Sequence, residues 1–322
     1  MIVFYPNTQT HCKHIPQVIA IFGVGLLGGS IYRNIINQVE IITQQRFDFD
    51  WISGEKQNCH AQKIHELLTK INIRSNTRIK RVVIVWSAGS AGFSSNNEEV
   101  ANELSTFQTV LDIARRLKTS LISTAVEFHL VSSAGGLFEG RTYVDEQTAP
   151  KPCRPYGYLK QAQEQLLLDE DLLIPQIYRP STVYGPILSG TRRGLVSTLL
   201  HNGSLKVVSN ILGHLYTLRD YVYYDDIGRY ISDSILLCEA SKRQRVSFLV
   251  SGKPTSIFEL IHIIERILKH RLYFKLQYHP NNSCDINFSP SVSPNDWRPT
   301  ALEYGCERIY REWQAQGGLR QY

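Results

Sequence analysis

Residues 17–28 read QVIAIFGVGLLG, and the rest of the predicted fold is organised around them. The apolar run from Val18 to Phe22 predicts a buried strand. The glycines at 23, 25 and 28 then have the spacing G-x-G-x-x-G, and a helix is expected from Ser30 to about Asn37. This spacing is a weak motif alone, but between a strand and a helix it is typical of a dinucleotide-binding turn.

Each part of this turn has a physical role in holding a dinucleotide. Gly23 permits the tight turn, Gly25 lets backbone amides approach a pyrophosphate, and Gly28 lets helix and strand pack closely. The N-terminus of the helix that follows favours the charge of the phosphates, and Leu26 and Leu27 of the turn are expected to contact the cofactor. The alternative is a glycine-rich helix start that only packs tightly.

The chain around this turn alternates strands and helices, which predicts a parallel, doubly wound sheet of Rossmann type. Residues 1–16 are expected to be an irregular lead-in. The expected strands are residues 39–43, a short third strand at 47–51, 81–86, 127–131 and 174–178, and the expected helices are residues 61–71, 98–118 and 155–168.

The end of the second strand bears on the choice of cofactor. An acidic residue there would hold a ribose 2′-hydroxyl, whereas an Arg would accept a 2′-phosphate. This strand runs into Gln44, Gln45 and Arg46. Arg46 therefore favours NADP over NAD, although a solvated surface Arg is a competing interpretation. Small residues after the expected strand at 81–86, Ala88 and Gly89, leave room for a ligand.

Tyr156 and Lys160 stand four residues apart in the helix that Pro155 opens, so they share one face of it. A phenol that acts near neutral pH needs its pKa lowered by about three units. One ammonium about 4 Å away supplies about that much. The pair therefore predicts a proton-transfer device, although a surface Tyr and a solvated Lys that share a face by chance are a competing interpretation. Tyr158 has no such partner, because Ala162 follows it by four residues.

Composition narrows the class of protein. A chain of 322 residues needs neither metal nor disulfides to build a core. The six cysteines are scattered without a CxxC pair, which suits reduced thiols in the cytoplasm, and His11, Cys12 and His14 lack a second ligand cluster for a metal. The net charge of +6 is mild, and no long apolar run appears. We expect no metal, no nucleic acid partner and no membrane partner.

The regularity of the pattern falls after residue 186. Residues 190–220 read as loop and short elements. A strand follows at 246–250, then a helix from Ser256 to His270, which opens with a capping box of Ser256 and Glu259, and a last helix from Ala301 to about Trp313. The predicted organisation is a dinucleotide-binding domain of residues 1–180 plus about 220–250. A smaller C-terminal α/β substrate domain comprises 181–219 and 251–322.

From about residue 17 to 315 the chain resembles the extended short-chain dehydrogenase/reductases named NAD-dependent epimerase/dehydratase, which act on nucleotide sugars. Six motifs carry this resemblance in the correct order. They are the glycine-rich turn, residues 102–106 (NELST, for the family's Asn-x-x-Gly-Thr), Ser132-Ser133, Tyr156-x-x-x-Lys160, residues 179–186 (RPSTVYGP) and residues 219–226 (RDYVYYDD).

The resemblance implies roles for these residues. Tyr156 would be the acid/base, and Lys160 would lower its pKa and hold the nicotinamide ribose. Ser133, or else Ser132, would hydrogen-bond the sugar oxygen. The resemblance also implies cofactor contacts from Asn102 and Pro180, and substrate contacts from Thr182 and from Arg219, which would meet the nucleotide diphosphate.

Several positions depart from the family pattern. The glycine turn is one residue shorter than the usual Gly-x-x-Gly-x-x-Gly. Thr182 replaces an Asn, and Ala134 stands where many members have the active Ser or Thr, which leaves Ser132 and Ser133 both open. The dehydratase branch has Asp-Glu where this chain has Gly135 and Gly136, so a dehydratase is not expected.

Three functions therefore remain. The first expectation is a 4-ketoreductase that uses NADPH on a nucleotide-diphosphate sugar. The alternative is a 4-epimerase with tightly bound NAD. A non-enzymatic NAD(P)-sensing regulator is disfavoured, because a sensor needs no acid/base pair. The resemblance also implies a homodimer, in which the helices at 98–118 and 156–168 pair across a two-fold axis.

Overall fold

The computed structural model describes residues 1–6, 17–51, 53–74, 79–188, 193–237 and 246–315. The chain divides into two compact units. The first comprises residues 1–137, 152–179 and 228–247, and the second comprises residues 138–151, 180–227 and 248–322. Residues 138–151 therefore group with the second unit, although the helix of Tyr156 and Lys160 that follows them belongs to the first.

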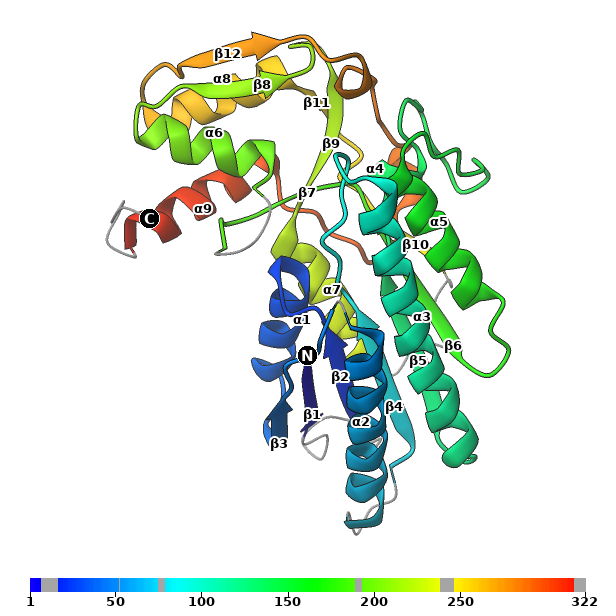
Figure 1. Cartoon of the computed structure of the whole chain (residues 1–322). Coiled ribbons are helices and arrows are strands. Elements are labelled where there is room, and N and C mark those ends of the chain that lie inside the picture. The colour runs from blue at the N-terminus through cyan, green and yellow to red at the C-terminus, as the bar shows by residue number, and fades with distance from the viewer. Residues whose placement is uncertain (7–16, 52, 75–78, 189–192, 238–245, 316–322) are drawn as a thin grey trace. The chain divides into compact units, whose positions relative to one another are not determined.

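A seven-stranded sheet with the order β10-β6-β5-β4-β2-β1-β3 organises the first unit (Figure 1). The neighbours β2, β4, β5 and β6 pair in parallel, which confirms the predicted Rossmann-type sheet. Its strands are β1 (Ile2–Pro6), β2 (Gln17–Phe22), β3 (Ile41–Arg46), β4 (Arg81–Trp86), β5 (Ala125–Val131), β6 (Ile174–Pro180) and β10 (Val246–Leu249).

The prediction of an irregular lead-in is wrong for residues 2–6. Strand β1 lies between β2 and β3 and is antiparallel to both, so that Ile2 stands opposite Ile21 on one side and Arg46 on the other. Ile2, Val3 and Phe4 are buried, and this burial stabilises the strand in place. Residues 7–16, with His11, Cys12 and His14, lie outside the described part of the chain.

Helices line the sheet, and α2, α3 and α5 lie side by side (Figure 1). Residues on both faces of β2 are buried, Val18 and Ala20 as well as Ile19 and Ile21, as expected for a strand covered on both sides. The helices are α1 (Leu26–Ile36), α2 (Gly54–Arg74), α3 (Asn97–Ser120), α4 (Ala134–Leu137), α5 (Pro155–Leu168) and α7 (Tyr224–Leu236), of which α7 begins in the second unit.

Two local expectations differ from the structure. The short strand predicted at residues 47–51 is wrong, because no strand forms there. The alternating aromatic residues instead pack over the strand ends, with the Phe49 ring 5.4 Å from Phe22 and the Trp51 ring 6.1 Å from Trp86. Helix α1 begins at Leu26, four residues earlier than predicted, so Gly28 lies inside its first turn.

The second unit has two small sheets, with orders β11-β9-β7 and β12-β8. Helix α8 packs against α6 and α9, and it begins with the predicted capping box of Ser256 and Glu259. The region predicted to hold loop and short elements, residues 190–220, contains the ten-residue helix α6. The elements are β7 (Thr182–Tyr184), α6 (Leu195–Ser204), β8 (Ser209–Leu212), β9 (Leu218–Tyr223), β11 (Pro254–Ser256), α8 (Ile257–Leu268), β12 (Phe274–Gln277), two 3₁₀ turns (Pro280–Asn282 and Pro290–Val292) and α9 (Leu302–Ala315).

Candidate active site

The glycine-rich turn has the shape that a pyrophosphate needs. Gly23 has a φ of +86°, and a Cβ added to it would lie 2.3 Å from the Cα of Ala88. A Cβ on Gly28 would lie 2.0 Å from the carbonyl oxygen of Gly23. No atom of the described residues comes within 4 Å of a Cβ built on Gly25, which is the N-cap of α1. The backbone of the turn is therefore closely packed at Gly23 and Gly28 and open at Gly25, where a pyrophosphate can approach.

The N-terminus of α1 is suited to an anion. Its first turn, which contains Leu26 and Leu27, carries no acidic residue, and no side chain caps it. The unpaired N–H groups and the helix dipole there favour a phosphate. The Ser87 hydroxyl also donates to the carbonyl oxygens of Gly23, at 2.8 Å, and Phe22, at 3.1 Å, which ties the turn to the end of β4. These residues fit the dinucleotide expected for the fold.

Helix α5 places Tyr156 and Lys160 one turn apart, as the spacing predicts. Pro155 starts the helix at its first position, where a missing N–H costs nothing. Tyr156 is half-buried and Lys160 is buried, and the Lys160 Nζ lies 5.6 Å from the centre of the Tyr156 ring. Tyr158 is 57% exposed. The helix thus presents one phenol beside one buried ammonium.

Lys160 has further partners that the sequence did not reveal. Its Nζ donates to Glu103 Oε1 at 3.2 Å and to Gln163 Oε1 at 3.0 Å. Burial alone would lower the pKa of the Lys160 ammonium, but the Glu103 carboxylate and the Tyr156 oxygen outweigh burial, so this pKa lies above its usual value. Lys160 therefore stays charged. A sequence signal for Glu103 existed, because it lies on the apolar stripe of α3 with Phe107 and Val110.

Helix α4 connects Ser133 to Tyr156, because its residue Gly136 contacts both. The amide of Gly136 donates to Ser133 Oγ at 3.0 Å. A Cβ on Gly136 would lie 2.9 Å from the Tyr156 ring, so the backbone of α4 packs directly against that ring. Ser132 Oγ is buried and has no hydrogen-bond partner among the described residues. The structure thus places Ser133, through α4, close to Tyr156 and Lys160. We call the surface formed by Tyr156, Lys160 and residues 133–136 the Tyr156 wall.

The other predicted cofactor residues are spread over the first unit. Arg46 ends β3 and is exposed. The inserted strand β1 makes β3 the second neighbour of β2, so at about 5 Å per strand these two strands lie about 10 Å apart. Asn102 is an exposed residue of α3, whose carbonyl accepts a hydrogen bond from Thr106 Oγ1 at 2.9 Å. Gly89 has a φ of +148°, and a Cβ added to it would lie 2.7 Å from Glu103 Oε1.

The predicted substrate residues Thr182 and Arg219 belong to the second unit, as does Pro180. Pro180 is the buried last residue of β6, and Thr182 opens β7 and is half-buried. The Arg219 guanidinium donates to the carbonyl oxygens of Leu218 at 3.0 Å, Asn282 at 2.9 Å, and Cys284. These carbonyls hold the guanidinium against the backbone at residues 282–284.

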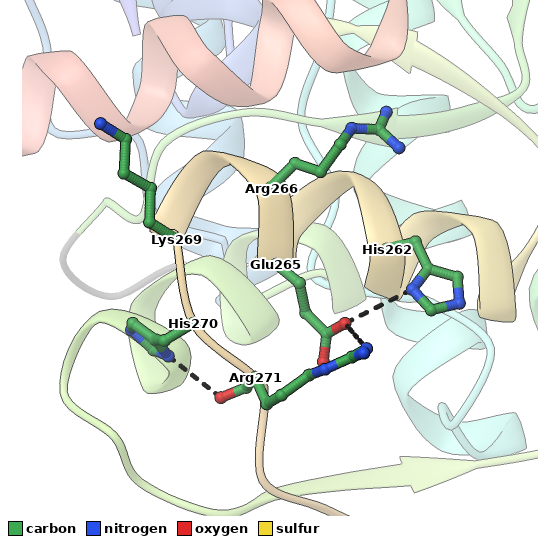
Figure 2. A pocket seen from close by; sticks show the side chains of 6 residues that line it. All are labelled: His262, Glu265, Arg266, Lys269, His270 and Arg271. Atoms are coloured by element: carbon green, nitrogen blue, oxygen red, sulfur yellow. Dashed lines mark hydrogen bonds and ion pairs between the residues drawn. The ribbon is translucent and has the colours of Figure 1, made fainter.

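A surface hollow of about 450 Å³ lies at the C-terminal end of α8 (Figure 2). One carboxylate lines it, that of Glu265, which pairs with Arg271 at 2.8 Å and with His262 at 3.4 Å. No residue of the predicted site lines the hollow, whose described walls are His262, Glu265, Arg266, Lys269, His270 and Arg271.

No group of His, Cys, Asp and Glu that could hold a metal occurs among the described residues. No helix in the same part of the chain is long and apolar enough to cross a membrane.

Comparison with solved structures supports the fold, at identities too low to show function. A UDP-glucose 4-epimerase from Thermus thermophilus in complex with NAD is 15% identical, with a TM-score of 0.72 over 92% of this chain and 99% of that one. A UDP-glucuronic acid 4-epimerase from Bacillus cereus, with UDP-glucuronic acid and NAD, is 17% identical, with a TM-score of 0.68 over 93% and 99%. RMD from Pseudomonas aeruginosa, complexed with NADPH, is 15% identical, with a TM-score of 0.69 over 93% and 99%.

The curated protein sequences contain no significant match to this chain. A family model does match, over residues 20–246, which is more than half of the chain and includes both the glycine-rich turn and the Tyr156–Lys160 pair. This match confirms the resemblance that the motifs indicated. The chain belongs to the NAD-dependent epimerase/dehydratase family.

Proposed function

We propose that this protein is an NAD(P)-dependent oxidoreductase that acts at C4 of a nucleotide-diphosphate sugar, as a 4-ketoreductase. The observation that carries the proposal is the Tyr156 wall, formed by Tyr156, Lys160 and residues 133–136. It places a phenol, a buried ammonium and a serine hydroxyl in one part of the first unit. This is the equipment for moving a proton on and off a sugar oxygen.

In this proposal each group has one task. Tyr156 gives its phenol proton to the C4 oxygen as the ketone is reduced, and Ser133 donates a hydrogen bond to the same oxygen. Lys160 offsets the negative charge that Tyr156 gains. The glycine-rich turn and the N-terminus of α1 hold the pyrophosphate of NAD or NADP, which supplies the hydride chemistry when bound.

The choice of a reductase rests on Arg46. It is exposed at the carboxyl end of β3, where it can meet a 2′-phosphate, and a reductase needs a cofactor that exchanges. Elimination of water is disfavoured, since Gly136 has no space for an acidic side chain beside the Tyr156 ring. A regulator that only senses NAD(P) would have no use for a buried charged lysine beside a tyrosine.

A 4-epimerase is the second candidate, and the position of β1 favours it. Because β1 lies between β2 and β3, Arg46 is one strand farther from the glycine-rich turn, and this makes a contact with a 2′-phosphate less favourable. The Thermus and Bacillus proteins of similar fold are 4-epimerases. An epimerase uses the same Tyr–Lys pair, but returns the hydride to the sugar and consumes no cofactor.

One pair of assays tests the proposal. The protein is incubated with NADPH and a nucleotide-diphosphate 4-keto-sugar, and the loss of NADPH absorbance is followed. In parallel, UDP-glucose is incubated without added cofactor and the sugars are analysed. We expect NADPH consumption in the first assay and no isomer in the second. Isomer formation without net cofactor use would instead establish the epimerase.

A further inference from the structure

Glu103 is a buried carboxylate that joins three elements of the first unit. It is 8% exposed and lies on α3. Its Oε1 accepts from Lys160 Nζ on α5 at 3.2 Å and from Gln163 Nε2 at 3.4 Å. Its Oε2 accepts from the backbone amide of Ala91 at 3.1 Å, in the loop that follows β4. One side chain thus fixes the lysine and the loop beside the glycine-rich turn.

Space around the carboxylate is restricted. A Cβ on Gly89 would lie 2.7 Å from Glu103 Oε1, so the loop after β4 approaches the carboxylate as closely as a glycine allows. Gln163 is fully buried and contacts both Lys160 and Glu103. The hydrogen bonds of the Glu103 carboxylate and its close packing against the loop after β4 therefore fix its position together.

The contact with Glu103 changes both the free hydrogen-bond donors of Lys160 and its effective charge. An ammonium has three donors, and Glu103 and Gln163 occupy two of them, which leaves one for a ligand or for Tyr156. Its positive charge is also compensated by the carboxylate. A lone ammonium favours the phenolate form of a neighbouring tyrosine, and a compensated ammonium favours it less.

We propose that Glu103 is a positioning residue that fixes Lys160 and compensates its charge, so that Tyr156 is kept as a proton donor. This deepens the proposed function and rests on it, because a proton donor is what the reduction of a keto-sugar needs. The buried glutamate acts on Tyr156 through Lys160, without touching substrate.

The other charged groups near the pair are engaged elsewhere. Glu164, one turn of α5 from Lys160, forms an ion pair with Arg179, with Oε2 and Nη2 2.6 Å apart. The guanidinium of Arg154 lies 5.0 Å from the centre of the Phe93 ring, and that ring in turn contacts Tyr156. Among the described residues, Glu103 is thus the carboxylate in direct contact with the lysine.

The test measures the titration of Tyr156 without substrate or cofactor. Phenolate absorbance is followed against pH in wild type and in Tyr156→Phe, and the difference isolates this one tyrosine. The same pair is measured in the Glu103→Gln background. We expect the midpoint of the difference curve to fall by about one pH unit when the charge of Glu103 is removed. Circular dichroism confirms that each variant is folded.

Two further variants sharpen the result. Glu103→Asp keeps the charge but draws it back by one methylene, so the midpoint should fall by less, and this variant serves if Glu103→Gln does not fold. Glu98→Gln removes an exposed charge from the first turn of the same helix and should leave the midpoint unchanged. An unchanged midpoint in the folded Glu103 variants overturns the proposal.

The outcome is separable from that of the proposed function. If the midpoint falls but no keto-sugar is ever reduced, Glu103 controls Tyr156 and the reductase assignment is wrong. If NADPH is consumed normally and the midpoint does not move, the reductase assignment stands and the role of Glu103 is wrong. As an activity readout, the alkaline limb of the wild-type pH–rate profile for reduction should move to lower pH in Glu103→Gln, because the reduction needs the protonated phenol.

Discussion

At the scale of single residues, the proposed chemistry depends on one hydroxyl. Tyr156→Phe removes only that hydroxyl, so the variant should fold and bind NADPH as wild type does. We expect turnover to fall at least about a hundredfold, because a positioned acid/base contributes that much or more. Steady-state rates and NADPH binding are measured together, with the exposed Tyr158→Phe as a matched control. Near-normal turnover in Tyr156→Phe would remove Tyr156 from the mechanism.

Arg46 is the second residue with a separable role. If its guanidinium meets a 2′-phosphate, that charge-assisted contact is worth about 1.5 kcal/mol or more, or at least about tenfold in affinity. We therefore expect NADPH to bind more tightly than NADH, and Arg46→Ala to lose most of this preference while NADH affinity stays unchanged. Titration of both proteins with both cofactors checks this. Wild type purified with tightly held NAD and no preference for NADPH would favour the epimerase.

At the scale of elements, α4 and α5 approach each other through glycines. A methyl group on Gly136 would lie 2.9 Å from the Tyr156 ring, whereas one on Gly135 would make only ordinary contacts at 3.7 and 3.8 Å. Gly136→Ala should therefore displace Tyr156 and lower turnover by about tenfold or more. Gly135→Ala is the matched control and should keep turnover. Equal activities in the two variants would show that the contact between α4 and Tyr156 does not position the phenol.

At the scale of the whole molecule, a buried ion pair ties the sheet together. Arg81 on β4 forms a bidentate pair with Glu127 on β5, and its guanidinium also donates to Gln17 at 2.6 Å and to the carbonyl of Ile235 on α7. Burial alone would raise the pKa of Glu127, but hydrogen bonds from His129 and Arg81 outweigh it and lower this pKa to about 2. The carboxylate is therefore charged throughout the physiological range.

This pair predicts how stability depends on pH. Because the pKa of Glu127 falls on folding from the usual 4.5 to about 2, its contribution is complete above pH 4.5 and is lost as the pH falls towards 2. Denaturant unfolding should show the free energy of unfolding decreasing over this range. Glu127→Gln should be about 3 kcal/mol less stable at neutral pH, since Arg81 stays buried without its partner. The free energy of unfolding of Glu127→Gln should decrease less steeply in acid than that of wild type. An equally steep decrease in both proteins would exclude Glu127 as a cause of the acid destabilisation.

Assembly is the other prediction for the whole molecule. Helices α3 and α5 lie side by side, which is the pair that the family resemblance places at a two-fold interface. We expect a homodimer, with a mass from light scattering twice that of the 36.8 kDa chain. A monomer mass at micromolar concentration would contradict the assignment.

Features that depend on residues close together in the chain could be predicted from the sequence alone. The glycine turn, the strand before it and the helix after it occupy one short stretch, so local geometry specified the Rossmann-type unit. Tyr156 and Lys160 are four residues apart on one helix, and helical periodicity put them on one face. The capping box of Ser256 and Glu259 was readable for the same reason.

Features made by distant segments depend on how the chain packs in three dimensions, and the sequence did not reveal them. Strand β1 enters the sheet between β2 and β3, a choice made by backbone pairing and burial that has no local signature. Glu103 reaches Lys160 across 57 positions, and its place on the apolar stripe of α3 indicates burial but not which residue it pairs with. The space that excludes a side chain at Gly136 belongs to the Tyr156 ring of another helix. Periodicity shows which way a residue faces, whereas its partner across the core depends on how the elements pack.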